Sequence, residues 1–169
     1  MILPGQGLEI RPARADDVEG VRQLVRDAYA VYIPRIGREP APMAADYGGL
    51  VREGVVTIAA DEDAIVGVLV LRPRPSSLLL ENIAVAPTEQ HRGIGRALMA
   101  FAEQRARELG LTKITLYTNA RMTENLSFYS RLGYVEVGRR REQGFDRVFF
   151  EKEIDPIDGG FLQELEPGM

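Results

Sequence analysis

A glycine-containing turn in the middle of the chain carries the strongest chemical signal in the sequence. Residues 90–97 read Gln-His-Arg-Gly-Ile-Gly-Arg-Ala and join a β-rich run to a helical pattern. Gly93 and Gly95 let the backbone approach a ligand closely, and the free N–H groups and dipole of the following helix favour an anion. Arg92 and Arg96 flank the turn and add full positive charges. The pattern predicts a phosphate-binding turn, although a plain strand-to-helix turn with two surface arginines has the same residues.

Two other phosphate loops fit this segment poorly. A P-loop needs Gly-Lys-Ser/Thr at the helix start, whereas Gly95 is followed by Arg96 and Ala97. A dinucleotide fingerprint needs a third small residue where Leu98 stands, and it usually opens the domain. A nicotinamide-dependent oxidoreductase is therefore disfavoured.

Three further residues could serve in proton transfer or polar recognition. Asn125 and Tyr129 stand four residues apart, so a helix places them on one face, where Tyr129 is either functional or a core contact. Glu81 lies in an apolar run, residues 78–85, whose alternation sets it in a row with Leu79, Ile83 and Val85. A carboxylate in such a row is costly unless it faces solvent, is paired or is used in chemistry.

Composition excludes several other kinds of site. The 169 residues include no Cys and one histidine, His91, which we expect to be exposed. Disulfides and a cysteine nucleophile are therefore excluded, and a metal site or a Ser-His-Asp triad is disfavoured. Four of the 25 acidic residues lie in residues 155–169, which contain no basic residue. Residues 1–154 therefore contain 21 acidic and 21 basic residues, and this balance gives no sign of a basic surface that would bind nucleic acid. Apolar runs are too short to span a bilayer, and residues 1–7 lack the basic region of a signal peptide, so a cytoplasmic protein is expected.

The elements that position these residues follow from hydrophobic periodicity and from Gly and Pro. They predict the order β-α-α-β-β-β-α-β-α-β-β, a mixed sheet with helices on both faces. The predicted strands are residues 8–11, 55–60, 64–71, 78–86, 113–118, 134–137 and 147–153. The first predicted helix starts at a capping box made by Asp16 and Glu19 and ends at or before Ile33, because Pro34 follows. A loop is predicted at residues 34–42. The other predicted helices are residues 43–52, 94–109 and 122–132.

Two sequence blocks together resemble the GNAT family, the Gcn5-related N-acetyltransferases. The first is Val85-Ala86-Pro87 followed by the glycine turn, and the second places Asn125, Phe128-Tyr129 and Gly133-Tyr134 at the family spacing. The resemblance implies an α/β fold with a mixed, mostly antiparallel sheet, flanked by helices on both faces, in a single domain at residues 1–154. Residues 155–169 would form an acidic tail that docks on a neighbour or frays.

The resemblance also implies acetyl-coenzyme A as the cosubstrate, without a metal. Main-chain N–H groups of the turn would bind the pyrophosphate, the strand before it would bind the pantetheine arm like an added strand, and the N–H of Val85 would stabilise the oxyanion. The implied coenzyme-binding residues are Ile83, Ala84, Val85, Gln90, Arg92, Gly93, Ile94, Gly95, Arg96, Ala97, Asn119, Asn125 and Tyr129.

Two side chains take catalytic roles by the same resemblance. Tyr129 would face the departing thiolate, and Glu81 would be the base. A tyrosine of pKa about 10 gives a proton uphill, by roughly 2 kcal/mol, to a thiolate of pKa about 8.5, so a hydrogen bond is the safer role. Direct abstraction by Glu81 faces a gap of about 8 kcal/mol, which requires desolvation, a water chain or a neutral amine.

The sequence therefore predicts an N-acetyltransferase whose amine acceptor attacks acetyl-coenzyme A directly in a ternary complex, since no cysteine can carry the acyl group. The alternative is a non-catalytic, acyl-coenzyme A-sensing domain of the same fold. The acceptor is a small molecule or a peptide amine; neither nucleic acid nor membrane is expected as a partner, and a homodimer stays open because relatives often dimerise. The acceptor wall is expected from Tyr29, Tyr32, Arg35, Met43 and Tyr47, although ordinary packing explains most of them equally well, and Arg35 suits a substrate carboxylate.

Overall fold

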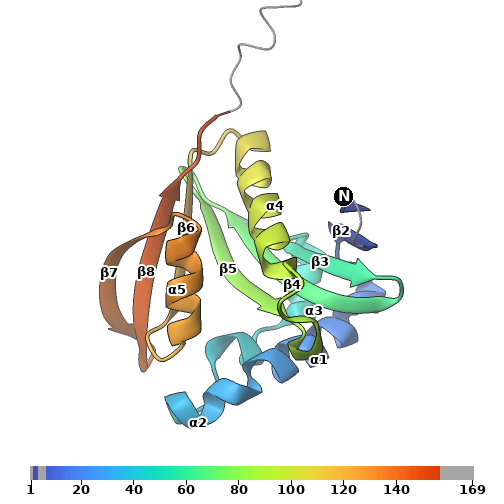
Figure 1. Ribbon diagram of the computed structural model, residues 1–169, viewed down its shortest axis with the longest axis horizontal. Helices are drawn as coiled ribbons and strands as arrows, with labels where there is room; N and C mark the ends of the chain where they lie inside the picture. The colour runs from blue at the N-terminus through green and yellow to red at the C-terminus, as the bar shows by residue number, and fades with distance from the viewer. Residues whose placement is uncertain (1, 4–6, 157–169) are drawn as a thin grey trace, which may run out of the picture.

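The computed structural model describes residues 2–3 and 7–156, which fold around one mixed sheet (Figure 1). Within these residues the sheet has eight strands in the order β1-β2-β3-β4-β5-β6-β8-β7, and every neighbouring pair is antiparallel except β5 and β6. The strands are β1 (Ile2–Leu3), β2 (Leu8–Pro12), β3 (Val56–Asp61), β4 (Ala64–Pro73), β5 (Leu78–Val85), β6 (Lys113–Asn119), β7 (Val135–Glu142) and β8 (Phe145–Glu153). The predicted fold class is confirmed.

Helices cover both faces of this sheet. They are α1 (Val18–Tyr29), α2 (Ile33–Ile36), α3 (Tyr47–Glu53), α4 (Ile94–Glu108) and α5 (Thr123–Arg131), with short 3-10 turns at Ala15–Asp17, Ala30–Tyr32, Ala41–Ala44 and Pro87–Glu89. On one face, α4 and α5 pack over a core that includes Leu98 and Tyr129. On the other face, α1 and α3 pack over a core that includes Val21 and Tyr47. Of the predicted tail, only residues 155 and 156 belong to the described part of the chain.

The start of α1 differs from the prediction. The capping box from Asp16 is wrong, because α1 begins at Val18 and Asp17 occupies its N-cap without bonding a helix N–H. The Asp17 carboxylate instead accepts hydrogen bonds from Arg11 Nη1 at 2.8 Å and from the N–H of Arg14 at 2.7 Å. Asp17 thus caps the 3-10 turn at Ala15–Asp17, through the N–H of Arg14, and also pairs with Arg11 of the preceding strand.

The segment between α1 and β3 is also more helical than predicted. Pro34 lies in the first turn of α2, where a missing N–H costs nothing, so residues 34–42 are not a plain loop. The next helix begins at Tyr47 rather than near Met43, because the side chain of Asp46 caps it by accepting from the N–H of Gly49 at 3.1 Å.

Strand β5 carries a one-residue bulge at Glu81. The residues on either side of it, Leu80 and Asn82, pair with consecutive residues of β4, which leaves Glu81 without a partner there. One extra residue exchanges the two faces of a strand. Leu80 accordingly belongs to the core under α4, whereas Ala84 belongs to the core under α1. The uninterrupted alternation predicted for residues 78–85 is wrong at this position.

Strands β5 and β6 separate after three residue pairs. Residues 78–80 pair in parallel with residues 114–116, and beyond them the two strands have no pairing although both continue. Strand β6 is paired with β8 over seven residue pairs, and this pairing keeps it from bending together with the bulged β5. Figure 1 shows the two strands diverging, with α4 and α5 on the near face and α1 at the open end. The main chain of β5 after Leu80 is thus left without a strand partner on this side.

Close approach of α4 to the sheet depends on Gly67 of β4. A Cβ atom there would lie 2.9 Å from Leu98 Cδ1 and 3.0 Å from Ile94 Cγ2, and both side chains are buried. We predict that Gly67→Ala lowers the free energy of unfolding by about 1–3 kcal/mol through overpacking, measured by urea denaturation. Gly138→Ala, whose Cβ would meet no atom within 4 Å, should change it by less than about 0.5 kcal/mol. Equal stabilities of the two variants would contradict this packing.

Candidate active site

The larger of two cavities at the separated strands lies at the N-terminal end of α4. Its volume is about 760 Å³, within the range of small-molecule sites. The glycine turn, the end of β5, α5 and the first helical segment all contribute to its wall. Of the predicted coenzyme-binding residues, it is lined by Ile83, Ala84, Val85, Gln90, Gly93, Ile94, Gly95, Arg96, Asn125 and Tyr129.

The turn before α4 directs main-chain N–H groups toward this cavity. Gly93 is the N-cap at φ 80°, a left-handed conformation that suits glycine, and it makes no side-chain cap. His91, which is exposed, adopts φ 73°, which costs a non-glycine residue about 1–2 kcal/mol. A Cβ at Gly95 would lie only 3.4 Å from Phe128 Cζ, so a side chain there would crowd the cavity wall. Open space and free N–H groups together make this helix start suitable for an anion.

Two of the predicted phosphate contacts are placed differently. Arg92 pairs with Asp61 at 3.1 Å and with Glu89, and it does not line the cavity, because these acids hold its guanidinium elsewhere. The N–H of Ala97 already donates to the carbonyl of Gly93 at 3.0 Å. Arg96 lines the cavity, and it forms no ion pair with the described residues.

The main chain of Ile83 and Val85 faces the gap between β5 and β6. The N–H of Ala86 donates to the carbonyl of Val66 on β4 at 2.9 Å. Because successive residues of a strand point their main-chain groups to opposite sides, those of Ile83 and Val85 point away from β4. The hydroxyl of Tyr29 donates to the carbonyl of Ile83 at 3.1 Å, which agrees with this direction.

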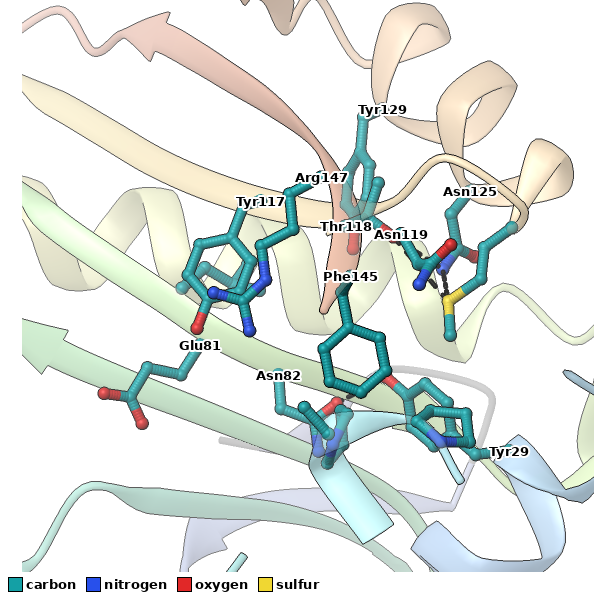
Figure 2. A pocket seen from close by; sticks show the side chains of 15 residues that line it. Tyr29, Glu81, Asn82, Tyr117, Thr118, Asn119, Asn125, Tyr129, Phe145 and Arg147 are labelled. Atoms are coloured by element: carbon teal, nitrogen blue, oxygen red, sulfur yellow. Dashed lines mark hydrogen bonds between the residues drawn. The ribbon is translucent and has the colours of Figure 1, made fainter. Parts of the chain in front are cut away.

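A second, smaller cavity of about 50 Å³ shares Asn125 and Tyr129 with the first (Figure 2). Its other lining residues come from α1, β5, β6, the N-cap of α5, the start of β8 and the segment before α3. They are Tyr29, Pro40, Ala41, Pro42, Leu80, Glu81, Asn82, Tyr117, Thr118, Asn119, Met122, Phe145 and Arg147. The two cavities therefore meet at one helical face of α5.

The predicted acceptor residues fall in three places. Tyr29 lines the smaller cavity, whereas Tyr32 and Arg35 line the larger one, and Met43 and Tyr47 line neither. Arg35 is already paired with Glu124 of α5 at 2.8 Å. Met43 packs against the core under α1, which explains its apolar character without a ligand.

A buried chain of hydrogen bonds supports the smaller cavity. The hydroxyl of Tyr29 donates to Asn82 Oδ1, Asn82 Nδ2 donates to the hydroxyl of Tyr47 at 3.1 Å, and that hydroxyl donates to the carbonyl of Pro42 at 2.6 Å. Sequence reasoning missed Asn82, although a polar residue in the middle of an apolar strand indicates a buried hydrogen bond or a functional role. The chain ties α1, β5 and α3 to the segment that covers the cavity.

Tyr129 is placed where both cavities can reach it. Its side chain is buried and packs against the rings of Phe128, Tyr134 and Phe150. Burial, and to a lesser extent nearby Tyr32, raises the pKa of Tyr129 well above its ordinary value, so the hydroxyl stays protonated at neutral pH. It forms no hydrogen bond with any described residue, so its donor is available to a ligand.

Glu81 lines the smaller cavity and is ion-paired. Its Oε1 accepts from Arg72 Nε at 2.7 Å, and Arg72 also binds Glu53 at 2.8 Å. The sequence left open whether Glu81 is paired or used in chemistry, and pairing is what the structure shows. Figure 2 places Glu81 and Tyr129 on different sides of the cavity.

Comparison with known proteins identifies the family. The sequence model of the acetyltransferase (GNAT) family matches residues 19–134. The chain belongs to this family. Uncharacterized N-acetyltransferase YvbK of Bacillus subtilis is 35% identical over 97 residues, which span 57% of this chain and 58% of that protein. The chain thus spans less than two-thirds of that relative.

Solved structures share the fold of this GNAT protein. The ribosomal-protein-S18-alanine N-acetyltransferase of Escherichia coli matches with a TM-score of 0.71 and 18% identity, over 87% of this chain and 94% of that one. The PaiA N-acetyltransferase of Thermoplasma acidophilum, solved with coenzyme A, matches with a TM-score of 0.68 and 19% identity, over 86% and 98%. No helix among the described residues is long and apolar enough to cross a membrane.

The buried hydrogen-bond chain generates a stability prediction. Tyr29→Phe removes the donor that Asn82 Oδ1 receives and should lower the free energy of unfolding by about 1–3 kcal/mol. Tyr32→Phe is the matched control, because that ring packs beside Tyr29, at 6.1 Å between centroids, and its hydroxyl has no hydrogen bond to the described residues. Chemical denaturation measures both variants. A Tyr29→Phe protein as stable as the Tyr32→Phe protein would contradict the role of the chain.

Proposed function

We propose that this GNAT protein is an acetyl-coenzyme A-dependent N-acetyltransferase in which the acceptor amine attacks the thioester directly. The observation that carries the proposal is the meeting of two cavities at Asn125 and Tyr129. One cavity has a helix start that is suited to an anion, and the wall of the other includes the polar side chains of Glu81, Asn82 and Arg147. A domain that only senses an acyl-coenzyme needs the first cavity alone, so the second favours an enzyme.

The larger cavity suits acetyl-coenzyme A, which when bound supplies an activated acetyl thioester. The diphosphate would accept hydrogen bonds from main-chain N–H groups of residues 94–96, with Arg96 adding charge. The pantetheine arm would bind as an extra strand along Ile83 and Val85, whose main-chain groups lack a β6 partner. Asn125 would complete the wall near the sulfur, whereas Asn119 lies in the smaller cavity.

The proposed reaction begins at the nitrogen of the acceptor. The neutral amine attacks the thioester carbonyl carbon, a C–N bond forms, the C–S bond breaks, sulfur leaves as a thiolate and nitrogen loses one proton. The main-chain N–H of Val85 points into the gap and would stabilise the negative oxygen of the transition state. The absence of Cys from this sequence disfavours a cysteinyl acyl-enzyme route.

Tyr129 would donate a hydrogen bond to the departing thiolate. Because burial raises its pKa, giving up the proton is even less favourable than for an ordinary tyrosine, so it stabilises by donation rather than transfer. Glu81 is the only acid among the described residues that line the smaller cavity. Arg72 binds its Oε1, and Oε2 would accept the amine proton only through water, because the carboxylate points away from Tyr129 (Figure 2).

The glycine turn gives the most direct binding prediction. Gly95→Asp adds bulk against Phe128 and a negative charge at the helix start, so affinity for coenzyme A should fall at least a hundredfold by titration calorimetry. Gly138→Asp makes the same change on β7, where a Cβ meets no atom within 4 Å, and should leave affinity within about twofold. Unchanged affinity in Gly95→Asp would refute the diphosphate site.

Tyr129→Phe separates hydrogen bonding from proton transfer. We expect kcat to fall about 10–100-fold, the value of one hydrogen bond to a charged group, with coenzyme affinity nearly unchanged. Since the folded pKa of Tyr129 is raised, its hydroxyl is protonated throughout pH 6–9, and the pH profile of kcat should keep its shape there. Loss of a titrating limb below pH 9 in the variant would contradict the donor role.

A further inference from the structure

We propose that the acceptor is a small amine that carries a carboxylate, and that Arg147 in the wall of the smaller cavity binds this carboxylate. The inference rests on the proposed function and narrows its substrate class. Sequence reasoning placed the carboxylate-binding cation at Arg35, which Glu124 already occupies at 2.8 Å.

Arg147 is a buried cation inside the cavity wall. Only 8% of its surface is exposed, and its guanidinium carbon lies 4.4 Å from the ring centroid of Tyr117, with which it shares the wall. Figure 2 shows the guanidinium beside this ring and facing the cavity interior. A planar guanidinium held against an aromatic face has its donor edge fixed, which suits bidentate binding of a carboxylate.

The charges around Arg147 leave an excess of positive charge. Glu142 accepts from Arg147 Nη1 at 3.0 Å, but it also accepts from Arg140 Nε at 2.6 Å, so two guanidinium groups share one carboxylate. Arg38 stacks on Phe145 at 4.1 Å, and it forms no ion pair with the described residues. The neighbouring Arg139 and Arg141 are balanced by their own acids, Glu136 and Asp146. Arg147, Arg140 and Arg38 therefore carry two more charges than Glu142 balances, and a bound carboxylate would reduce this excess at this end of the cavity.

Hydrogen-bond donors are also left over at this end. Arg147 has five N–H donors, and two of its nitrogens each bind one protein acceptor, Glu142 and Gln143. Asn119, which is opposite Arg147 in the β6–β8 register, uses its Oδ1 to accept from the N–H of Arg121. Its amide nitrogen has no partner among the described residues. The remaining donors of Arg147 and Asn119 match the two oxygens of one carboxylate.

The size of the cavity limits the acceptor. Its volume is about 50 Å³, and Pro40 and Pro42 cover it, the latter held by the hydroxyl of Tyr47. A small headgroup fits better than a folded partner. With its carboxylate at Arg147, such a molecule has its amine free to face Tyr129, where the two cavities meet. The amine then attacks the thioester carbonyl carbon as in the proposed function, and the carboxylate forms and breaks no bond.

The test uses the full chain, acetyl-coenzyme A and matched acceptors. The acceptors are L-amino acids, their α-carboxamides, and dipeptide amides, which keep the amine but lose the carboxylate. Thiol release gives kcat/KM for each acceptor. For the best amino acid we expect at least a tenfold preference over its carboxamide, since charge-assisted bonds to a carboxylate exceed those to an amide.

Three variants identify the residue responsible. Arg147→Gln should reduce the preference for carboxylate over carboxamide to less than threefold, mainly through KM. Arg147→Lys keeps the charge but loses the planar pair of donors, so an intermediate preference is expected, and it serves if the Gln variant does not fold. Arg139→Gln is the matched control, because this arginine lies on the same strand as Arg140, pairs with its own acid Glu136 and does not line the cavity. Its preference should match that of the wild type.

The inference is overturned if carboxylate and carboxamide react equally, if dipeptide amides are preferred, if no carboxylate-bearing amine reacts, or if the preference survives both substitutions of Arg147. Titration calorimetry with acetyl-coenzyme A separates these results from a failure of the proposed function. If coenzyme binds and other amines are acetylated, only the acceptor class is wrong. If coenzyme does not bind, the proposed function falls and the acceptor class falls with it.

Discussion

Short pairing between β5 and β6 is the constraint on which the rest of the site depends. A main-chain N–H or C=O that is taken from water needs a partner, and a strand normally finds it on its neighbours. Here the bulge at Glu81 turns β5 while seven residue pairs keep β6 against β8, so the two strands part after residues 80 and 116. An extended ligand can supply the partners that β6 does not, which is why an opening in a sheet becomes a binding groove.

The other features of the site follow from the position of this gap. The start of α4 lies at one side of it, so an anion and an extended arm can bind in one continuous cavity. Tyr129 lies where this cavity meets the smaller one; its raised pKa keeps it protonated at neutral pH, and its hydroxyl has no hydrogen-bond partner within residues 2–3 and 7–156. Arg147 lies on β8 and Asn119 lies on β6, and these two paired strands diverge from β5. The same separation of strands would therefore produce both the proposed coenzyme side and the proposed acceptor side.

Sequence reasoning succeeded where the signal was local. The periodicity of α4, the glycine turn before it and the four-residue spacing of Asn125 and Tyr129 are all set within one turn or helix. It failed where partners are distant in the chain: Arg92 meets Asp61 from β3, and Arg147 meets Tyr117 of β6. No residue pattern in the sequence predicts such contacts before the strand order is known. A one-residue bulge leaves an even weaker trace, because both faces of β5 are apolar.

Amide hydrogen exchange with and without coenzyme A tests the central claim most directly, because it reports individual N–H groups of the gap. The account predicts slower exchange on coenzyme binding at Val85 and at residues 94–96, with little change along β7 at the far edge of the sheet. If coenzyme binds but these amides exchange as before, or if protection appears at β7 instead, the gap between β5 and β6 is not the binding groove.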